Sequence, residues 1–124
     1  MRHDLGMRRG KQIAQGSHAS MAFLCEKLRQ VIYQRSDRLF NIDLLSTVEK
    51  EWILGLFTKI CCRVNSEQEL IEIFNKAKEA GLEAHLITDS GKTEFNGVPT
   101  PTCVAIGPDY SHKIDSITKD LQLL

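Results

Sequence analysis

A long helical repeat near the start of the chain limits the possible folds more than any other stretch. Between positions 11 and 34, apolar side chains return every three or four residues. This spacing predicts one helix that begins after Gly10 and buries a single stripe. The stripe comprises Ile13, Ser17, Met21, Leu24, Leu28 and either Val31 or Ile32.

The first turns of the predicted helix also carry a polar stripe. Lys11, Gln15 and His18 follow the spacing i, i+4, i+7, which places them on one side of a helix. These side chains are unusual to bury and well suited to hold a polar substrate. Two interpretations stay open for His18: a packed, hydrogen-bonded side chain, which is the commoner case within a helix, or a base.

The rest of the chain alternates between strand and helix patterns. Strands are predicted at 58–64, 83–88 and 103–106, with a further edge strand at 121–124. Helices are predicted at 44–55, 66–81 and 112–118, and a loop at 36–41. This order predicts an α/β protein, a single-domain three-layer α/β/α sandwich over residues 1–124. Its sheet would be small, mixed and mostly parallel, with about four strands.

Composition excludes several classes of protein. The 124 residues suit one hydrophobic core, and no apolar run approaches the ~20 residues of a membrane span. The N-terminus has no secretory signal, so we expect a cytoplasmic protein without membrane contact. The four cysteines form no C-x-x-C pair and show no zinc-site spacing. They are predicted to be buried reduced thiols, and no metal or cofactor is expected.

Charge is balanced overall but uneven along the chain. Residues 1–40 carry eight basic residues against three acidic ones, a local charge of +5 on a chain of net charge zero. A basic region on a neutral protein indicates a localised anionic partner such as phosphate or nucleic acid. A solvated helix face is the alternative explanation of the same pattern.

Residues 89–102 form a second informative stretch, a loop rich in turn-forming residues. The sequence at 91–93, Gly-Lys-Thr, matches the end of a phosphate-binding loop motif. That motif needs a glycine at position 86, where this chain has Leu86. Asp89 follows a predicted strand directly, and Lys11 begins a helix, so both could face one crevice. A carboxylate beside a lysine can orient water for ester hydrolysis. A turn-capping role is the alternative for Asp89.

Several ordered motifs make the chain resemble the archaeal-type (type 2) peptidyl-tRNA hydrolase family. Residues 4–19 match its D-L-x-M-x-x-G-K-x-x-A-Q-x-x-H-A signature. Residues 65–67 and 77–82 match its N-S-E and A-K-E-A-G-L helix, and residues 89–93 match its D-x-G-x-T loop. Thr102 and the stretches 106–108 and 114–124 match the end of the family pattern. Residues 25–55 carry no match.

The resemblance implies a metal-free esterase of translation. It would cleave the bond between a peptide, or an N-blocked amino acid, and the 3′ end of tRNA. Lys11, Asp89 and Thr93 would be the catalytic set, with His18, Gln15 and Thr102 as cleft neighbours. Arg8 and Arg9 would face tRNA phosphates, where each neutralised phosphate adds salt dependence. A homodimer is considered beside a monomer.

One departure from the family pattern keeps an alternative open. The family has an apolar first strand before the Asp4 position, whereas only Met1, Arg2 and His3 precede it here. We therefore expect a truncated first strand and an exposed sheet edge. The alternative function is a catalytically inactive tRNA- or protein-binding module of the same fold.

Overall fold

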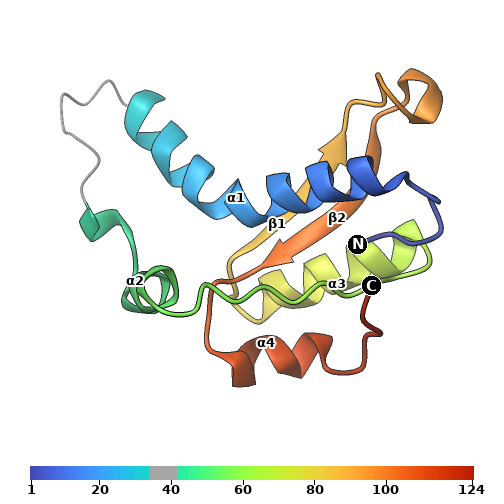
Figure 1. The fold of residues 1–124 in the computed structure, drawn as a ribbon. Coiled ribbons are helices and arrows are strands. Elements are labelled where there is room, and N and C mark those ends of the chain that lie inside the picture. Colours follow the sequence, from blue (N-terminus) through green and yellow to red (C-terminus); the bar gives the residue numbers. More distant parts are fainter. Residues whose placement is uncertain (34–41) are drawn as a thin grey trace.

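The computed structural model describes residues 1–33 and 42–124 (Figure 1). Its elements in order are α1 Arg9–Tyr33, α2 Thr47–Leu54, α3 Glu67–Glu79, β1 Ala84–Asp89, β2 Thr100–Ile106 and α4 Ser111–Thr118, with 3₁₀ turns at Ile42–Leu44 and Phe95–Gly97. The four predicted helices are confirmed, as is the α/β class. The loop predicted at 36–41 lies outside the described residues.

Helices cover both faces of a sheet formed by β1 and β2 (Figure 1). The face of β2 that carries Cys103 packs on α1, where the thiol meets the Gln15 carbonyl. Val104 and Ile106 lie on the opposite face and pack against Leu70 and Ile73 of α3. The layers therefore follow the α/β/α order, and α4 packs on α3.

The predicted sheet of about four mostly parallel strands is not observed. Among the described residues the sheet has two strands, β1 and β2, and they are antiparallel. The stretches predicted as strands at 58–64 and 121–124 form only isolated bridges, Arg2 to Val64 and Cys62 to Leu123. A strand needs a partner along its length, and within residues 1–33 and 42–124 only the backbone of Met1–His3 pairs with both Val64 and Thr102.

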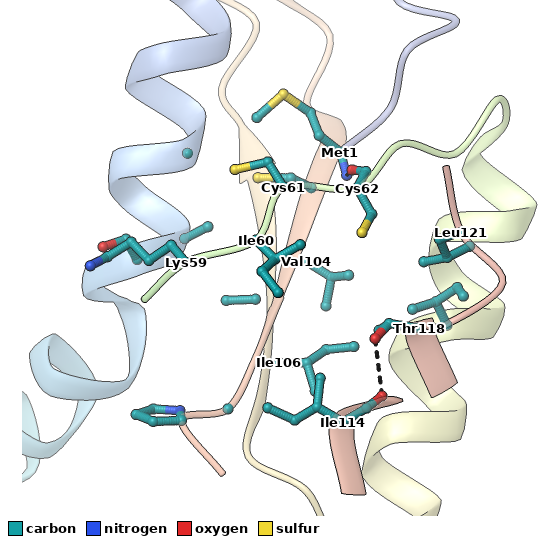
Figure 2. A pocket seen from close by; sticks show the side chains of 18 of the residues that line it. Met1, Lys59, Ile60, Cys61, Cys62, Val104, Ile106, Ile114, Thr118 and Leu121 are labelled. Carbon is teal, nitrogen blue, oxygen red and sulfur yellow. Dashed lines mark hydrogen bonds between the residues drawn. The ribbon is translucent and has the colours of Figure 1, made fainter. Parts of the chain in front are cut away.

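An open groove lies between residues 58–62 and β2, and Met1 is part of its lining (Figure 2). It measures about 590 Å³, and Ile60, Val104 and Ile106 supply part of its apolar lining. Ile60 remains 72% exposed beside it. The cysteines are all free thiols as predicted, but only Cys103 is buried and Cys61 is exposed. Among the described residues this segment pairs only through isolated bridges, which leaves it open along the groove.

The predicted buried stripe of α1 is wrong at its N-terminal end. Ile13 is 70% exposed and Met21 45% exposed, whereas Gln15 and Phe23 are buried. The helix turns its 15-19-23 face to the sheet because the polar group at Gln15 has partners there. In the described part of the chain, no helix is both long enough and apolar enough to cross a bilayer.

Candidate active site

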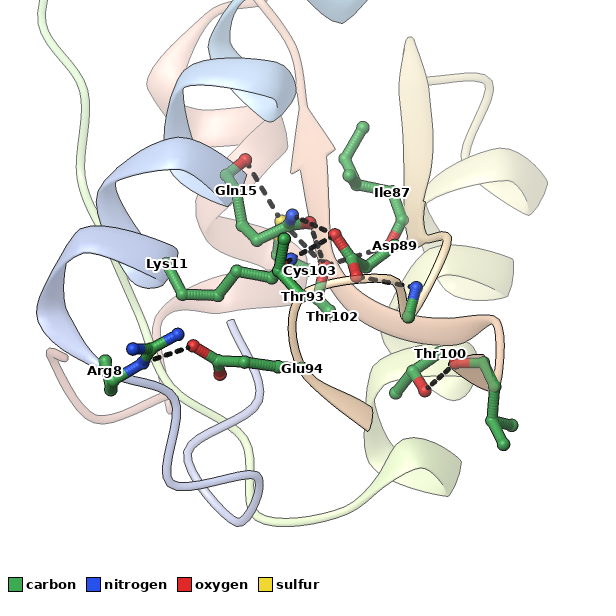
Figure 3. A network of polar contacts seen from close by, with 12 residues as sticks. Arg8, Lys11, Gln15, Ile87, Asp89, Thr93, Glu94, Thr100, Thr102 and Cys103 are labelled. Carbon is green, nitrogen blue, oxygen red and sulfur yellow. Dashed lines mark hydrogen bonds and ion pairs between the residues drawn. The ribbon is translucent and has the colours of Figure 1, made fainter. Parts of the chain in front are cut away.

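The first turn of α1 meets the carboxyl end of β1 at a partly buried ion pair (Figure 3). Lys11 Nζ lies 2.5 Å from Asp89 Oδ2, and each side chain is only 12% exposed. The two residues are 78 positions apart in sequence. α1 begins and β1 ends here, so the structure brings Lys11 and Asp89 together.

Asp89 is held in its ionised form by donors on both oxygens. Oδ2 accepts from Lys11 Nζ and, at 2.9 Å, from Gln15 Nε2. Oδ1 accepts from the Gly91 amide at 2.8 Å. These contacts, with the Lys11 hydrogen bond the strongest cause, lower the pKa of Asp89 despite the opposing effect of burial. Because each carboxylate oxygen can accept about two hydrogen bonds, Oδ1 keeps one lone pair for a water molecule.

The loop after β1 needs glycine at position 91. Gly91 has φ 78°, in the left-handed region, and a Cβ there would lie 2.4 Å from the Val98 carbonyl oxygen. The loop closes on itself through the Gly97 amide, which donates to the Gly91 carbonyl at 2.9 Å. The close packing fixes the amide that binds Asp89.

A β-bulge in β2 turns the Thr102 side chain toward Gln15 of α1. The register pairs Ile87 with Cys103 and Thr88 with Pro101, so Thr102 is the extra residue. A bulge lets adjacent side chains leave the usual alternation. Thr102 and Cys103 consequently both contact Gln15 of α1.

Gln15 and Thr102 support Asp89 rather than line an open surface. Gln15 is 2% exposed and Thr102 is fully buried. The Thr102 hydroxyl donates to Gln15 Oε1 at 2.5 Å, which leaves the Gln15 amide nitrogen to donate to Asp89. The hydroxyl therefore fixes which way the Gln15 amide faces.

Thr93 completes the group around the lysine. Lys11 Nζ donates to Thr93 Oγ1 at 3.1 Å. An ammonium group has three protons, so one remains after Asp89 and Thr93 are bonded. The Thr93 hydroxyl accepts from Lys11, so its own proton is also free to donate. Two donors thus stand beside a carboxylate with one open lone pair.

The other predicted site residues lie outside this network. His18 is exposed and has no hydrogen-bond partner in the described residues, because position 18 lies beside the 15-19-23 face of α1. Arg9 is exposed as well. Arg8 is 78% exposed and its Nε lies 2.9 Å from Glu94 Oε1, a pair that links the loop before α1 to the loop after β1.

Sequence reasoning missed the role of Arg2, which it counted only as a charge. Arg2 is 8% exposed and pairs with Asp4 and Glu67, each at 2.7 Å. It also donates to the Pro101 carbonyl at 3.2 Å. The contacts lower the pKa of Asp4, chiefly through the Arg2 hydrogen bond. Arg2 joins the start of α3, the loop before α1 and the bulged end of β2.

The bulge was also missed, although the sequence holds a signal for it. Proline within a strand is confined to edges and bulges, and Pro101 lies one residue before Thr102.

In the described part of the chain, no three His, Cys, Asp or Glu side chains gather in a way that could hold a metal ion.

Comparisons with known proteins agree along the whole chain. The sequence profile of the family described as "Peptidyl-tRNA hydrolase PTH2" matches residues 1–124. A peptidyl-tRNA hydrolase of Methanocaldococcus jannaschii is 42% identical over 125 aligned positions, which cover 100% of this chain and 95% of the relative. One from Sulfolobus acidocaldarius is 38% identical, with 100% and 95% covered. A probable peptidyl-tRNA hydrolase 2 of Dictyostelium discoideum is 35% identical, with 99% and 51% covered.

Proposed function

The chain belongs to the peptidyl-tRNA hydrolase PTH2 family, and from that premise we propose that it hydrolyses peptidyl-tRNA at the Lys11–Asp89 site. It is a carboxylic ester hydrolase that splits the ester between the peptidyl, or N-blocked aminoacyl, group and the tRNA 3′ end. The observation that carries the site assignment is the partly buried ion pair with its three further hydrogen bonds. Lys11, Asp89 and Thr93 are the proposed catalytic residues.

We assign each side chain a step. A water molecule on the open lone pair of Asp89 Oδ1 attacks the ester carbonyl, and the carboxylate orients it. The negative charge that develops on the carbonyl oxygen is stabilised by the free proton of Lys11 and by the Thr93 hydroxyl. The C–O bond to the ribose breaks, and the proton lost by the water ends on the ribose oxygen. Gln15 and Thr102 keep Asp89 in position.

The tRNA contact is proposed at the loop before α1. Arg9 is exposed, and Arg8 is exposed although paired with Glu94. Both flank Lys11, so phosphates near the 3′ end of the tRNA would meet them. A surface ion pair is worth little in water, so a phosphate can replace Glu94 as the partner of Arg8. Each phosphate neutralised should add to the salt dependence of binding.

The test is release of the acyl group from N-acetyl-aminoacyl-tRNA. We expect activity from the wild type, a loss of about 10²- to 10⁴-fold in Lys11→Ala and Asp89→Ala, and full activity in the exposed control Lys119→Ala. Equal activity in all four proteins would refute the site. A folded wild type that binds tRNA and releases nothing would instead be the inactive binding module.

Assembly and location complete the proposal. We keep the homodimer as a prediction, which sedimentation velocity across a range of concentrations would test.

An enzyme that acts on a product of translation belongs where tRNA is used, so we propose a cytoplasmic location. Fluorescence imaging of the tagged full chain would test it.

A further inference from the structure

Phe95, two residues after the proposed catalytic Thr93, has an unfavourable backbone conformation. Its φ is 67°, and Asn96 follows with φ 52°. Asparagine adopts the left-handed region readily, but a bulky side chain there is a genuine outlier. Such outliers persist where the surroundings hold them, and they cluster at functional sites. An aromatic ring at this position therefore calls for an explanation beyond the turn itself.

The loop directs three consecutive residues at the start of α1. Thr93 bonds to Lys11, Glu94 pairs with Arg8, and the Phe95 ring centroid lies 5.8 Å from Lys11 Nζ. The Val98 amide donates to the Phe95 carbonyl at 2.9 Å, which closes the turn. Phe95 is half-buried, and its neighbours Thr93 and Asn96 in this loop are exposed.

We propose that the Phe95 ring is the stacking surface for the terminal base of the RNA substrate. The inference rests on the proposed function, because it needs an ester on the 3′ ribose at Lys11 and Asp89. The base is joined to that same ribose, so it lies one sugar away from the reacting carbonyl. A ring next to Lys11 is within reach of it.

The chemistry of the ring agrees with this role. Phenylalanine has no hydrogen-bonding group and offers a base only its π-face, which stacks on any base. The neighbouring cations Arg8 and Arg9 attract the phosphates and leave the uncharged base to the ring. A stacked base would add to the binding of the RNA, so its loss should appear in KM.

The experiment is a double-perturbation cycle with the full chain. Wild type and Phe95→Leu act on two N-acetyl-aminoacyl RNAs, one ending in adenosine and one whose terminal nucleotide lacks its base. With the adenosine substrate we expect Phe95→Leu to raise KM about 5- to 150-fold, with kcat within about twofold. With the baseless substrate the wild type should show the same rise, and Phe95→Leu should add nothing to it.

Two control variants separate the effect of the Phe95 ring from the effect of the turn conformation. Phe95→Trp keeps a stacking surface and should restore KM. Asn96→Gly changes the adjacent left-handed residue, keeps the ring and should leave both constants unchanged. Thermal melting establishes that each variant folds.

Three results would overturn the proposal. They are a KM effect of Phe95→Leu that persists on the baseless substrate, a loss confined to kcat, and no effect at all. A loss of kcat would mean that the ring only positions Lys11. If the wild type releases no acyl group from either RNA, the proposed function fails; binding of the two uncharged RNAs, by fluorescence anisotropy, then decides the stacking question separately.

Discussion

Replacing Asp89 by asparagine tests the site most directly, because the change keeps the shape of the side chain and removes its charge. The carboxylate accepts bonds from Lys11, Gln15 and the Gly91 amide. An amide has only one oxygen. If that oxygen faces Lys11 and Gln15, the new NH₂ group points at the Gly91 N–H, and donor meets donor. The opposite orientation places the NH₂ group against the ammonium.

The expected cost follows from burial. Removing one partner of a buried ion pair costs about 3–5 kcal/mol. Here each side chain keeps 12% exposure, so water can reach the stranded ammonium and we expect about 2–4 kcal/mol at pH 7. Urea unfolding of wild type and Asp89→Asn would measure the difference. Asp120→Asn, at an exposed position of the same charge, is the matched control and should change stability by less than about 0.5 kcal/mol.

The stability difference between wild type and Asp89→Asn should depend on pH. The pKa of Asp89 is lowered in the folded protein, so its contribution is complete above the unfolded value, near 3.8, and is lost as pH falls through the folded pKa. The gap between wild type and Asp89→Asn should therefore be constant near neutrality and shrink in acid. Asp4 and Asp109, whose pKa values are also lowered, are common to both proteins and cancel. A gap below about 0.5 kcal/mol at pH 7, or one unchanged in acid, would refute the reasoning.

Three further outcomes are expected. Gly91→Ala should lose about 2–4 kcal/mol in urea unfolding, because its Cβ would strike the Val98 carbonyl, whereas Gly97→Ala, with φ 80° but open space, should lose only about 1 kcal/mol. Thr102→Val should lose about 1–3 kcal/mol and lower kcat, because the buried Gln15 oxygen loses its donor; an unchanged kcat would show that Gln15 needs no such fixing. Reversing the charge of Arg9 should raise KM for tRNA and flatten its salt dependence, and a KM that is insensitive to salt in both proteins would contradict the proposed phosphate contact.

Much of the local structure could be predicted because its causes are local. The helical spacing after Gly10 gave α1 within a residue or two, and the turn-rich stretch after Asp89 gave a loop at the end of a strand. The buried face of α1 could not be predicted in this way. Hydrophobicity favoured Ile13, but the helix buries Gln15, because a satisfied hydrogen-bond network can hold a polar side chain in the interior.

The sheet is a second feature that the local sequence pattern could not predict. The pattern of residues 58–64 is that of a strand, but strand pairing is a property of two segments. In the part of the chain that the structure describes, only Met1–His3 supplies backbone partners on the β2 side. Propensity alone cannot supply the missing hydrogen bonds. The groove beside Ile60 is the result.

By itself the sequence determined the helices, the strand end at Asp89, a helix start within two residues of Lys11 and the family to which these residues belong. Tertiary structure alone decided that Lys11 and Asp89 meet, and that a bulge at Thr102 supports them through Gln15. The reason is physical. Helix periodicity and turn chemistry act over a few residues, whereas an ion pair across 78 positions exists only when the packing of α1 on β1 and β2 brings its two halves together.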